Sequence, residues 1–201
     1  MKNKWFYALL GIIVVAAVVG TILFSNTEEK QVTACLDNKA SEECYTEYLQ
    51  AGVDAYAQEN YELALEKFKL SALAYDNDKA AGFTVWRNIG NAYQELGQYS
   101  QAQEVYDELL QINHQDIAMV YLDYIRLFDR QQDYQGALGV ANEAYDKIKN
   151  PSYLYKKAQI LEEMEKYNEE IEIYERLLLE DSANKESIQA KIDRIKKAHK
   201  L

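Results

Sequence analysis

The sequence predicts an all-α protein in which one apolar helix precedes a series of short amphipathic helices. Residues 5–24 form an uncharged apolar run, whereas the chain after residue 44 has apolar residues at helical spacing and almost no strand-like alternation. In this later region a tyrosine recurs at one register about every 35 residues. One proline and eight glycines in 201 residues argue against a turn-rich β-sandwich or a loop-rich disulfide scaffold.

The run from Trp5 to Phe24 is long enough to cross a membrane as a helix. At about 1.5 Å per residue it reaches roughly 30 Å, the thickness of a hydrocarbon core. Lys2 and Lys4 precede the run, and this positive bias predicts a cytoplasmic tail at residues 1–4. We therefore expect a single-pass protein of the cytoplasmic (inner) membrane, with its N-terminus inside, a linker at residues 25–41 and the remaining chain outside the cytoplasm.

Two alternative interpretations of this segment stay open. A cleaved signal peptide also has an apolar core, although this run is longer than such cores and no small-x-small cleavage site follows it. Residues 32–35 (Val-Thr-Ala-Cys) resemble a relaxed bacterial lipobox, but the polar residues 25–31 separate them from the apolar run. Lipidation at Cys35 is therefore the weaker alternative.

The two cysteines, Cys35 and Cys44, lie close together just before the helical region. In an extracytoplasmic compartment they are candidates for a disulfide that would join the linker to the first helix. Two reduced, inert thiols are the alternative. Their spacing excludes a Cys-x-x-Cys redox motif, and two cysteines with two histidines are too few for a zinc site.

The region after residue 44 contains a repeated pattern of tyrosine, small and bulky residues. Three residues after each recurring tyrosine a small residue usually follows, and a bulky one usually comes four residues later. The members of the four copies are Tyr61, Ala64 and Phe68; Tyr99, Ala102 and Tyr106; Tyr134, Ala137 and Ala141; and Tyr167, Glu170 and Tyr174. Two helices approach closely only where side chains are small, and aromatic rings fill the complementary space.

The clearest copy carries Trp86, Gly90, Tyr93, Gly97 and Ala102. It resembles the tetratricopeptide repeat, a helix-turn-helix unit of about 34 residues. Gly52 occupies the position of Gly90 in the first copy, and the signature proline is absent from all four. The resemblance implies a right-handed α-solenoid of four repeats and a C-terminal capping helix. The expected bounds are 42–75, 79–112, 117–149 and 151–181 for the repeats and 183–201 for the capping helix.

Local signals divide the helices in the same way. Ser41, Asp133 and Asn150 are predicted to cap the helices that follow them. The interval between the first two recurring tyrosines is longer than the others by about one helical turn. This predicts an extra turn in the helix after Asp78 or in the one before Tyr75.

The resemblance also implies where a partner binds. The first helix of each repeat lines a concave groove, and in the family such grooves take extended peptides or helices of partner proteins. Arg87 and Asn91 resemble the start of a carboxylate clamp, but Asp123 and Ser152 stand where asparagine and lysine are expected and Lys156 fits only loosely. Ordinary polar groove residues are the better interpretation. The expected groove residues are Tyr56, Arg87, Asn91, Gln94, Arg126, Tyr155 and Gln159.

Composition and motifs exclude several other functions. The net charge of −11 argues against nucleic-acid binding. No phosphate loop, metalloprotease motif or nucleophile elbow occurs, and neither His114 nor His199 has a catalytic partner in sequence. We expect no catalytic residue, no metal, no cofactor and no small-molecule substrate. Residues 185–201 are basic, which suits either helix-dipole complementarity or docking to an acidic partner or lipid headgroups.

These observations favour a membrane-anchored, extracytoplasmic scaffold or adaptor that mediates protein–protein interaction. Residues 5–24 would contact the membrane, and the groove would hold a protein or peptide. Such a protein would be an assembly factor or accessory subunit of an envelope, secretion or pilus complex in a bacterium. The alternative is a periplasmic chaperone that binds unfolded clients transiently.

Overall fold

The computed structural model describes residues 42–73 and 75–201, with side chains from residue 45 onward. This part of the chain consists of nine α-helices and contains no strand, which confirms the all-α prediction. The helices are α2 (Glu42–Ala57), α3 (Tyr61–Leu73), α4 (Phe83–Glu95), α5 (Tyr99–Leu109), α6 (Ile117–Arg130), α7 (Tyr134–Ile148), α8 (Ser152–Glu163), α9 (Tyr167–Glu180) and α10 (Lys185–His199). They form two compact units, one ending at Val85 and the other spanning Trp86–Leu201, and each is described by itself.

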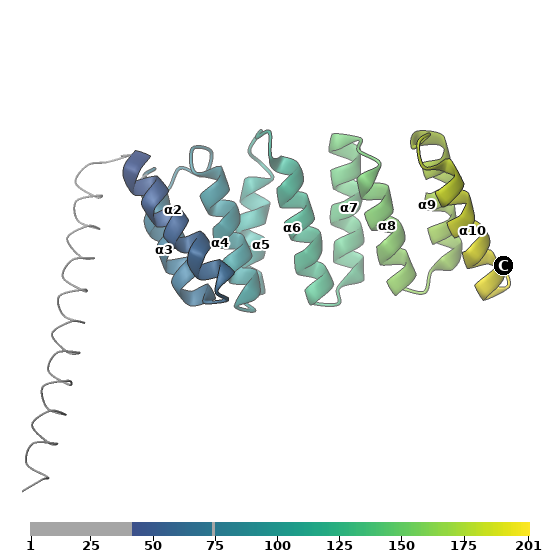
Figure 1. Ribbon diagram of the computed structural model, residues 1–201, viewed down its shortest axis with the longest axis horizontal. Helices are drawn as coiled ribbons and strands as arrows, with labels where there is room; N and C mark the ends of the chain where they lie inside the picture. Colours follow the sequence, from purple (N-terminus) through teal and green to yellow (C-terminus); the bar gives the residue numbers. More distant parts are fainter. Residues whose placement is uncertain (1–41, 74) are drawn as a thin grey trace, which may run out of the picture. The chain divides into compact units, whose positions relative to one another are not determined.

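The first unit is built on the helix pair α2 and α3, which pack against each other (Figure 1). Gly52 lies against the ring of Phe68, so closely that a Cβ atom at Gly52 would come within 2.5 Å of that ring. Ala64 and Phe68 are both buried. Ser71 Oγ donates a hydrogen bond of 3.0 Å to the carbonyl oxygen of Tyr45 and ties the two helices together.

The second unit is a series of helix pairs in which each helix from α5 to α10 packs against the next (Figure 1). Gly90 of α4 meets Tyr106 of α5 in the same way that Gly52 meets Phe68, with a Cβ-to-ring distance of 2.6 Å. Ala102 and Ala137 have no exposed surface. Small residues therefore do permit the close approach of paired helices that the sequence predicts.

Contacts between residues about one repeat apart in sequence connect successive helix pairs in this unit. The rings of Tyr121 and Tyr153 lie 6.3 Å apart between α6 and α8. The hydroxyl of Tyr153 also donates to the carbonyl oxygen of Ala118, 35 residues earlier. Tyr145 of α7 donates in the same way to Glu180 of α9, again 35 residues away. First helices thus pack on first helices and second helices on second helices.

The recurring tyrosines mark the start of every second helix. Tyr61, Tyr99, Tyr134 and Tyr167 are the first residues of α3, α5, α7 and α9, and all four are half-buried. The half-buried position suits a residue with an apolar ring and a polar tip.

The predicted cap at Asp133 is confirmed, whereas the N-cap of α8 is Pro151 and not Asn150, whose side chain bonds two residues ahead. The Asp133 carboxylate accepts a hydrogen bond of 3.0 Å from the backbone N–H of Gly136 at the start of α7. The Asn150 side chain accepts one of 2.9 Å from the backbone N–H of Ser152. Ser41 lies outside the described residues.

The prediction of a longer helix near Asp78 is wrong. Neither α3 nor α4 gains a turn, since both have 13 residues. The extra residues lie in the connection before α4, where the Asp78 carboxylate accepts hydrogen bonds from the backbone N–H groups of Ala80 and Ala81. An aspartate that satisfies nearby N–H groups stabilises a turn in place of a continued helix.

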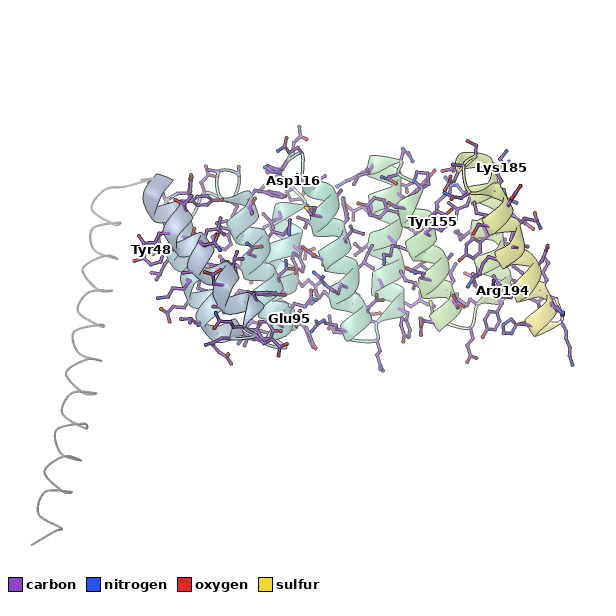
Figure 2. All side chains as sticks on the ribbon, viewed as in Figure 1. Tyr48, Glu95, Asp116, Tyr155, Lys185 and Arg194 are labelled. Carbon is purple, nitrogen blue, oxygen red and sulfur yellow. The ribbon has the colours of Figure 1, made fainter. Side chains whose placement is uncertain are left out.

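The last helix, α10, covers α9 and closes the second unit. Ile188, Ile192 and Ile195 are buried along one side of it. Lys191 pairs with Glu162 of α8 at 3.1 Å, and Lys196 lies 3.6 Å from Glu175 of α9. Part of the basic charge of α10 is therefore neutralised within the unit, whereas Lys185 and Arg194 are exposed (Figure 2).

Several predictions concern residues that the structure does not describe. The apolar run 5–24, the linker 25–41 and Cys35 lie outside the described residues, as does the side chain of Cys44. Among the helices that are described, none combines the length and apolar character that crossing a membrane requires.

Candidate functional site

The expected groove residues come from the first helices of successive repeats. Arg87, Asn91 and Gln94 lie on α4, Arg126 lies on α6, and Tyr155 and Gln159 lie on α8. Tyr56 belongs to α2 in the first unit, where its ring contacts Tyr61 at 5.2 Å. The structure brings the α4 and α6 members into direct contact.

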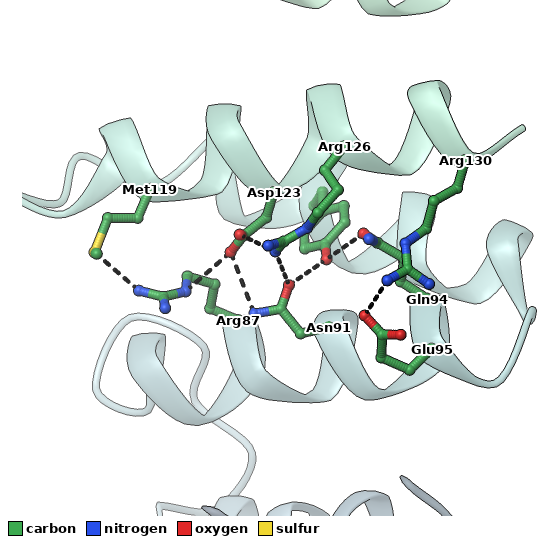
Figure 3. A network of polar contacts seen from close by, with 9 residues as sticks. Arg87, Asn91, Gln94, Glu95, Met119, Asp123, Arg126 and Arg130 are labelled. Atoms are coloured by element: carbon green, nitrogen blue, oxygen red, sulfur yellow. Dashed lines mark hydrogen bonds and ion pairs between the residues drawn. The ribbon is translucent and has the colours of Figure 1, made fainter. Parts of the chain in front are cut away.

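A carboxylate on α6 is the centre of this contact. Asp123 pairs with Arg126 one turn along its own helix, and Arg87 Nε of α4 lies 3.1 Å from its Oδ2 (Figure 3). Asn91 Nδ2 donates to the same carboxylate at 3.3 Å. Burial raises the pKa of Asp123, while the neighbouring Arg126 and Arg87 guanidinium groups oppose that rise.

These contacts argue against a carboxylate clamp for a partner peptide. Arg87 Nε and Asn91 Nδ2 lie against Asp123, and Arg87 Nη1 donates to Met119 Sδ, so these donors are already engaged within the protein. Ser152, where the comparison needs a lysine, is the first residue of α8 and is exposed. The cluster therefore acts as an internal polar contact between α4 and α6.

The polar contact extends along both helices (Figure 3). The Tyr106 hydroxyl donates to Asn91 Oδ1 at 2.7 Å and lies 3.3 Å from the amide of Gln94. Gln94 is buried, which the sequence analysis did not anticipate for a groove residue. At the far end, Arg130 of α6 pairs with Glu95 of α4 at 2.7 Å.

The α8 members lie farther along the second unit. Tyr155 is half-buried, and its hydroxyl donates to Asp181 at 2.9 Å (Figure 2). Burial and this acidic neighbour raise the pKa of Tyr155 to about 12. Gln159 is exposed.

Gln159 lines a cavity of about 430 Å³ between α6, the start of α7 and α8. Asp129 enters it from α6, Tyr134 from α7, and Lys156 and Glu163 from α8. The pKa of Asp129 is raised by burial, lowered by Lys156 and raised again by Glu163. Sequence reasoning missed Asp129 and Glu163 because no motif marks them and they meet only where α6 and α8 pack.

Sequence reasoning also missed a set of tyrosine–carboxylate hydrogen bonds. The Tyr153 hydroxyl donates to a backbone carbonyl. Besides Tyr155, three other tyrosines donate to acidic side chains on neighbouring helices, and each of these three pairs joins a different combination of helices. The pairs are Tyr121 with Glu143, Tyr124 with Asp107, and Tyr145 with Glu180.

Nothing in the described part of the chain forms a cluster of histidine, cysteine and acidic residues suited to a metal ion. His114 Nδ1 accepts a hydrogen bond from the backbone N–H of Asp116, and His199 stacks on Tyr167 at 3.4 Å. Both histidines have structural contacts.

Comparison with known families identifies two of the repeats. Tetratricopeptide-repeat family models match residues 83–116 and 151–184, that is, α4 with α5 and α8 with α9. A search of curated proteins found no significant match.

Solved structures share the fold at low sequence identity. A MamA fragment from Desulfovibrio magneticus RS-1 is 19% identical, with a TM-score of 0.55 over 80% of this chain and 92% of that chain. PilF from Pseudomonas aeruginosa is 18% identical, with a TM-score of 0.56 over 79% and 70%. A tetratricopeptide repeat protein from Parabacteroides merdae is 15% identical, with a TM-score of 0.60 over 79% and 62%.

Proposed function

We propose that this chain, which contains tetratricopeptide repeats, is a scaffold or adaptor that binds a partner protein along the exposed faces of α6 and α8. The observation that carries the proposal is the stacking of first helices, because it puts exposed side chains of neighbouring repeats on one surface. Gln159 is exposed there, and so is Arg126, although Arg126 also pairs with Asp123. A rigid series of helix pairs is suited to recognition because the surface is preformed.

The proposal includes a membrane tether. The apolar run 5–24 would hold the repeats at the outer side of the cytoplasmic membrane, and the linker 25–41 would let them reorient. Confinement to the membrane raises the effective concentration of the repeats toward other membrane proteins. This arrangement suits an assembly factor or accessory subunit of an envelope, secretion or pilus complex.

The binding surface is tested by photocrosslinking in cells. A photoreactive residue at Arg126 or Gln159 is expected to capture a protein, and one at Glu172 on α9 is the matched control on an exposed position elsewhere. Crosslinks that form only from Glu172 would refute the proposed surface.

The periplasmic chaperone alternative predicts a different result in detergent extracts. A scaffold is expected to migrate with a discrete partner during size fractionation, whereas a transient chaperone migrates alone. Purification of the full chain from membranes, followed by mass spectrometry, identifies the partner in the first case.

Sidedness is tested by reporter fusions at the C-terminus. A fused reporter enzyme that works only in the periplasm is expected to be active. A fused reporter that works only in the cytoplasm is expected to be inactive. The opposite pattern would overturn the proposed topology without affecting the binding surface.

A further inference from the structure

One face of α6 begins with apolar residues, passes a basic residue and ends with an acidic one. Met119 and Leu122 are 47% and 42% exposed, although the other apolar residues of this helix are largely covered. Arg126 and Asp129 continue the same stripe, because residues three and four apart lie on one side of a helix. Arg87 Nη1 of α4 donates to Met119 Sδ at 3.0 Å, but Met119 and Leu122 both keep the exposed surface given above, so this face has room for another segment.

The acidic end of the stripe opens into the cavity of about 430 Å³. Glu163 lines the cavity from α8, opposite Asp129 of α6, and Lys156 is its cationic residue. Glu162 also lines it but is already paired with Lys191 at 3.1 Å. The cavity therefore has more negative than positive charge.

Two carboxylates in the cavity are without an ion pair in the part of the chain that the structure describes. These are Asp129 and Glu163, and the Glu163 carboxylate raises the cost of ionising Asp129 across the cavity. Burial adds to this cost for Asp129, and Lys156 offsets only part of it. A further cation in the cavity would relieve the repulsion, so charge complementarity favours a basic side chain.

We propose that this face of α6 and α8 binds a segment of the partner protein that carries an apolar residue and, about three positions away, a lysine or arginine. The apolar residue packs on Met119 and Leu122, and the basic one enters the cavity between Asp129 and Glu163. At about 1.5 Å per helical residue, Leu122 and Asp129 are roughly 10 Å apart along α6. An extended peptide covers that distance in about three residues.

This inference rests on the proposed function and specifies the chemistry of its partner. The test measures fluorescence anisotropy of labelled dodecapeptides with the full chain in detergent. The first probe carries leucine and arginine three positions apart in a serine–glycine background. The second has glutamate in place of the arginine, and the third has leucine and arginine adjacent.

The first probe is expected to bind most tightly. The double substitution Asp129→Asn with Glu163→Gln is expected to weaken it about tenfold and to leave the second probe unaffected, because two partly exposed ion pairs are lost. The matched control, Glu169→Gln with Glu172→Gln, makes the same charge change on exposed positions of α9 and is expected to change little.

Three results would overturn the inference. They are equal binding of the first and second probes, equal weakening by both double substitutions, and no binding of the first probe. If photocrosslinking from Arg126 or Gln159 still captures a protein, the proposed function stands and only the predicted chemistry of the partner fails.

Discussion

At the scale of single residues, packing between paired helices depends on complementary size. Gly90 leaves room for the fully buried ring of Tyr106. The equivalent positions of the third repeat carry Ile125 and Ala141, both buried, so the bulky side chain has moved to the opposite helix. The summed volume of the two paired side chains is conserved although the residue types differ, as expected for close-packed interiors.

Gly90→Ala is therefore expected to destabilise the protein. The new Cβ would lie 2.6 Å from Tyr106, and relief of this overlap costs about 1–3 kcal/mol, more than the gain in helix propensity. Gly139→Ala is the matched control, because Gly139 of α7 has open space around it and is expected to gain about 0.5–1 kcal/mol. Chemical denaturation of both variants measures the two effects. If the two variants change the unfolding free energy equally and in the same direction, the contact with Tyr106 does not determine the effect of Gly90→Ala.

Glu170 is an ionisable residue at a fully buried position. It stands where the other repeats carry a buried alanine, and it has no exposed surface. Neither carboxylate oxygen has a hydrogen-bond partner in the described part of the chain, and Lys191 Nζ lies 3.9 Å from one of them. Burial and the nearby Glu162 raise the pKa of Glu170, and Lys191 opposes this rise.

Glu170→Gln is expected to stabilise the protein at neutral pH and to have little effect in acid. Because the folded-state pKa is raised, the wild type loses stability as the pH rises from the unfolded pKa of about 4.3 toward the folded value. The stability difference should grow over that interval to about 1 kcal/mol and then stay constant. Thermal melts at a series of pH values measure it, with the exposed Glu172→Gln as control. A stability difference between Glu170→Gln and the wild type that is independent of pH would contradict a raised pKa of Glu170.

At the scale of helices, α10 is held mainly by apolar burial. Its ion pairs involve partly exposed lysines, and exposed pairs contribute little to stability. Ile188, Ile192 and Ile195 cover the last repeat, which would otherwise leave an apolar face in water. A terminal helix with these contacts acts as a cap on the stack.

Ile192→Ala is accordingly expected to cost about 2–4 kcal/mol of unfolding free energy, since Ile192 is 2% exposed. Leu179→Ala on α9 is the matched control: Leu179 is 85% exposed, and its truncation should change stability by less than about 0.5 kcal/mol. Urea denaturation monitored by circular dichroism gives both values. Similar small effects for the two variants would mean that α10 does not stabilise the stack.

At the scale of the whole molecule, the sequence predicts what depends on local spacing. The recurring tyrosines predict the repeats, and in the structure each of them is the first residue of a second helix, from Tyr61 to Tyr167. Arg87, Asn91 and Arg126, which the register predicts as groove residues, contact one another or Asp123 in the structure. The role of Asp123 as their shared partner could not be predicted, because it depends on how two helices 32 residues apart pack. The turn at Asp78 was missed because extra residues between repeats fit a longer helix or a longer connection equally well in sequence.

Asp123 connects two repeats, so its loss should affect one end of the second unit more than the other. In a repeat protein, stability is approximately the sum of each repeat and its interfaces with its neighbours. Asp123→Ala leaves the guanidinium of Arg87 partly buried without its carboxylate, which weakens the contact between α4 and α6.

Hydrogen exchange measured by mass spectrometry separates a local from a global effect of this substitution. Peptides from α4 and α5 are expected to lose protection, while those from α8 and α9 keep it, because their own contacts, such as Tyr145 with Glu180, are unchanged. Asp116→Ala, which removes a half-exposed carboxylate before α6, is the control and should leave both regions protected. Uniform loss of protection across the second unit would show instead that its repeats unfold as one cooperative block, and the Asp123 cluster would then stabilise the whole unit and not one junction.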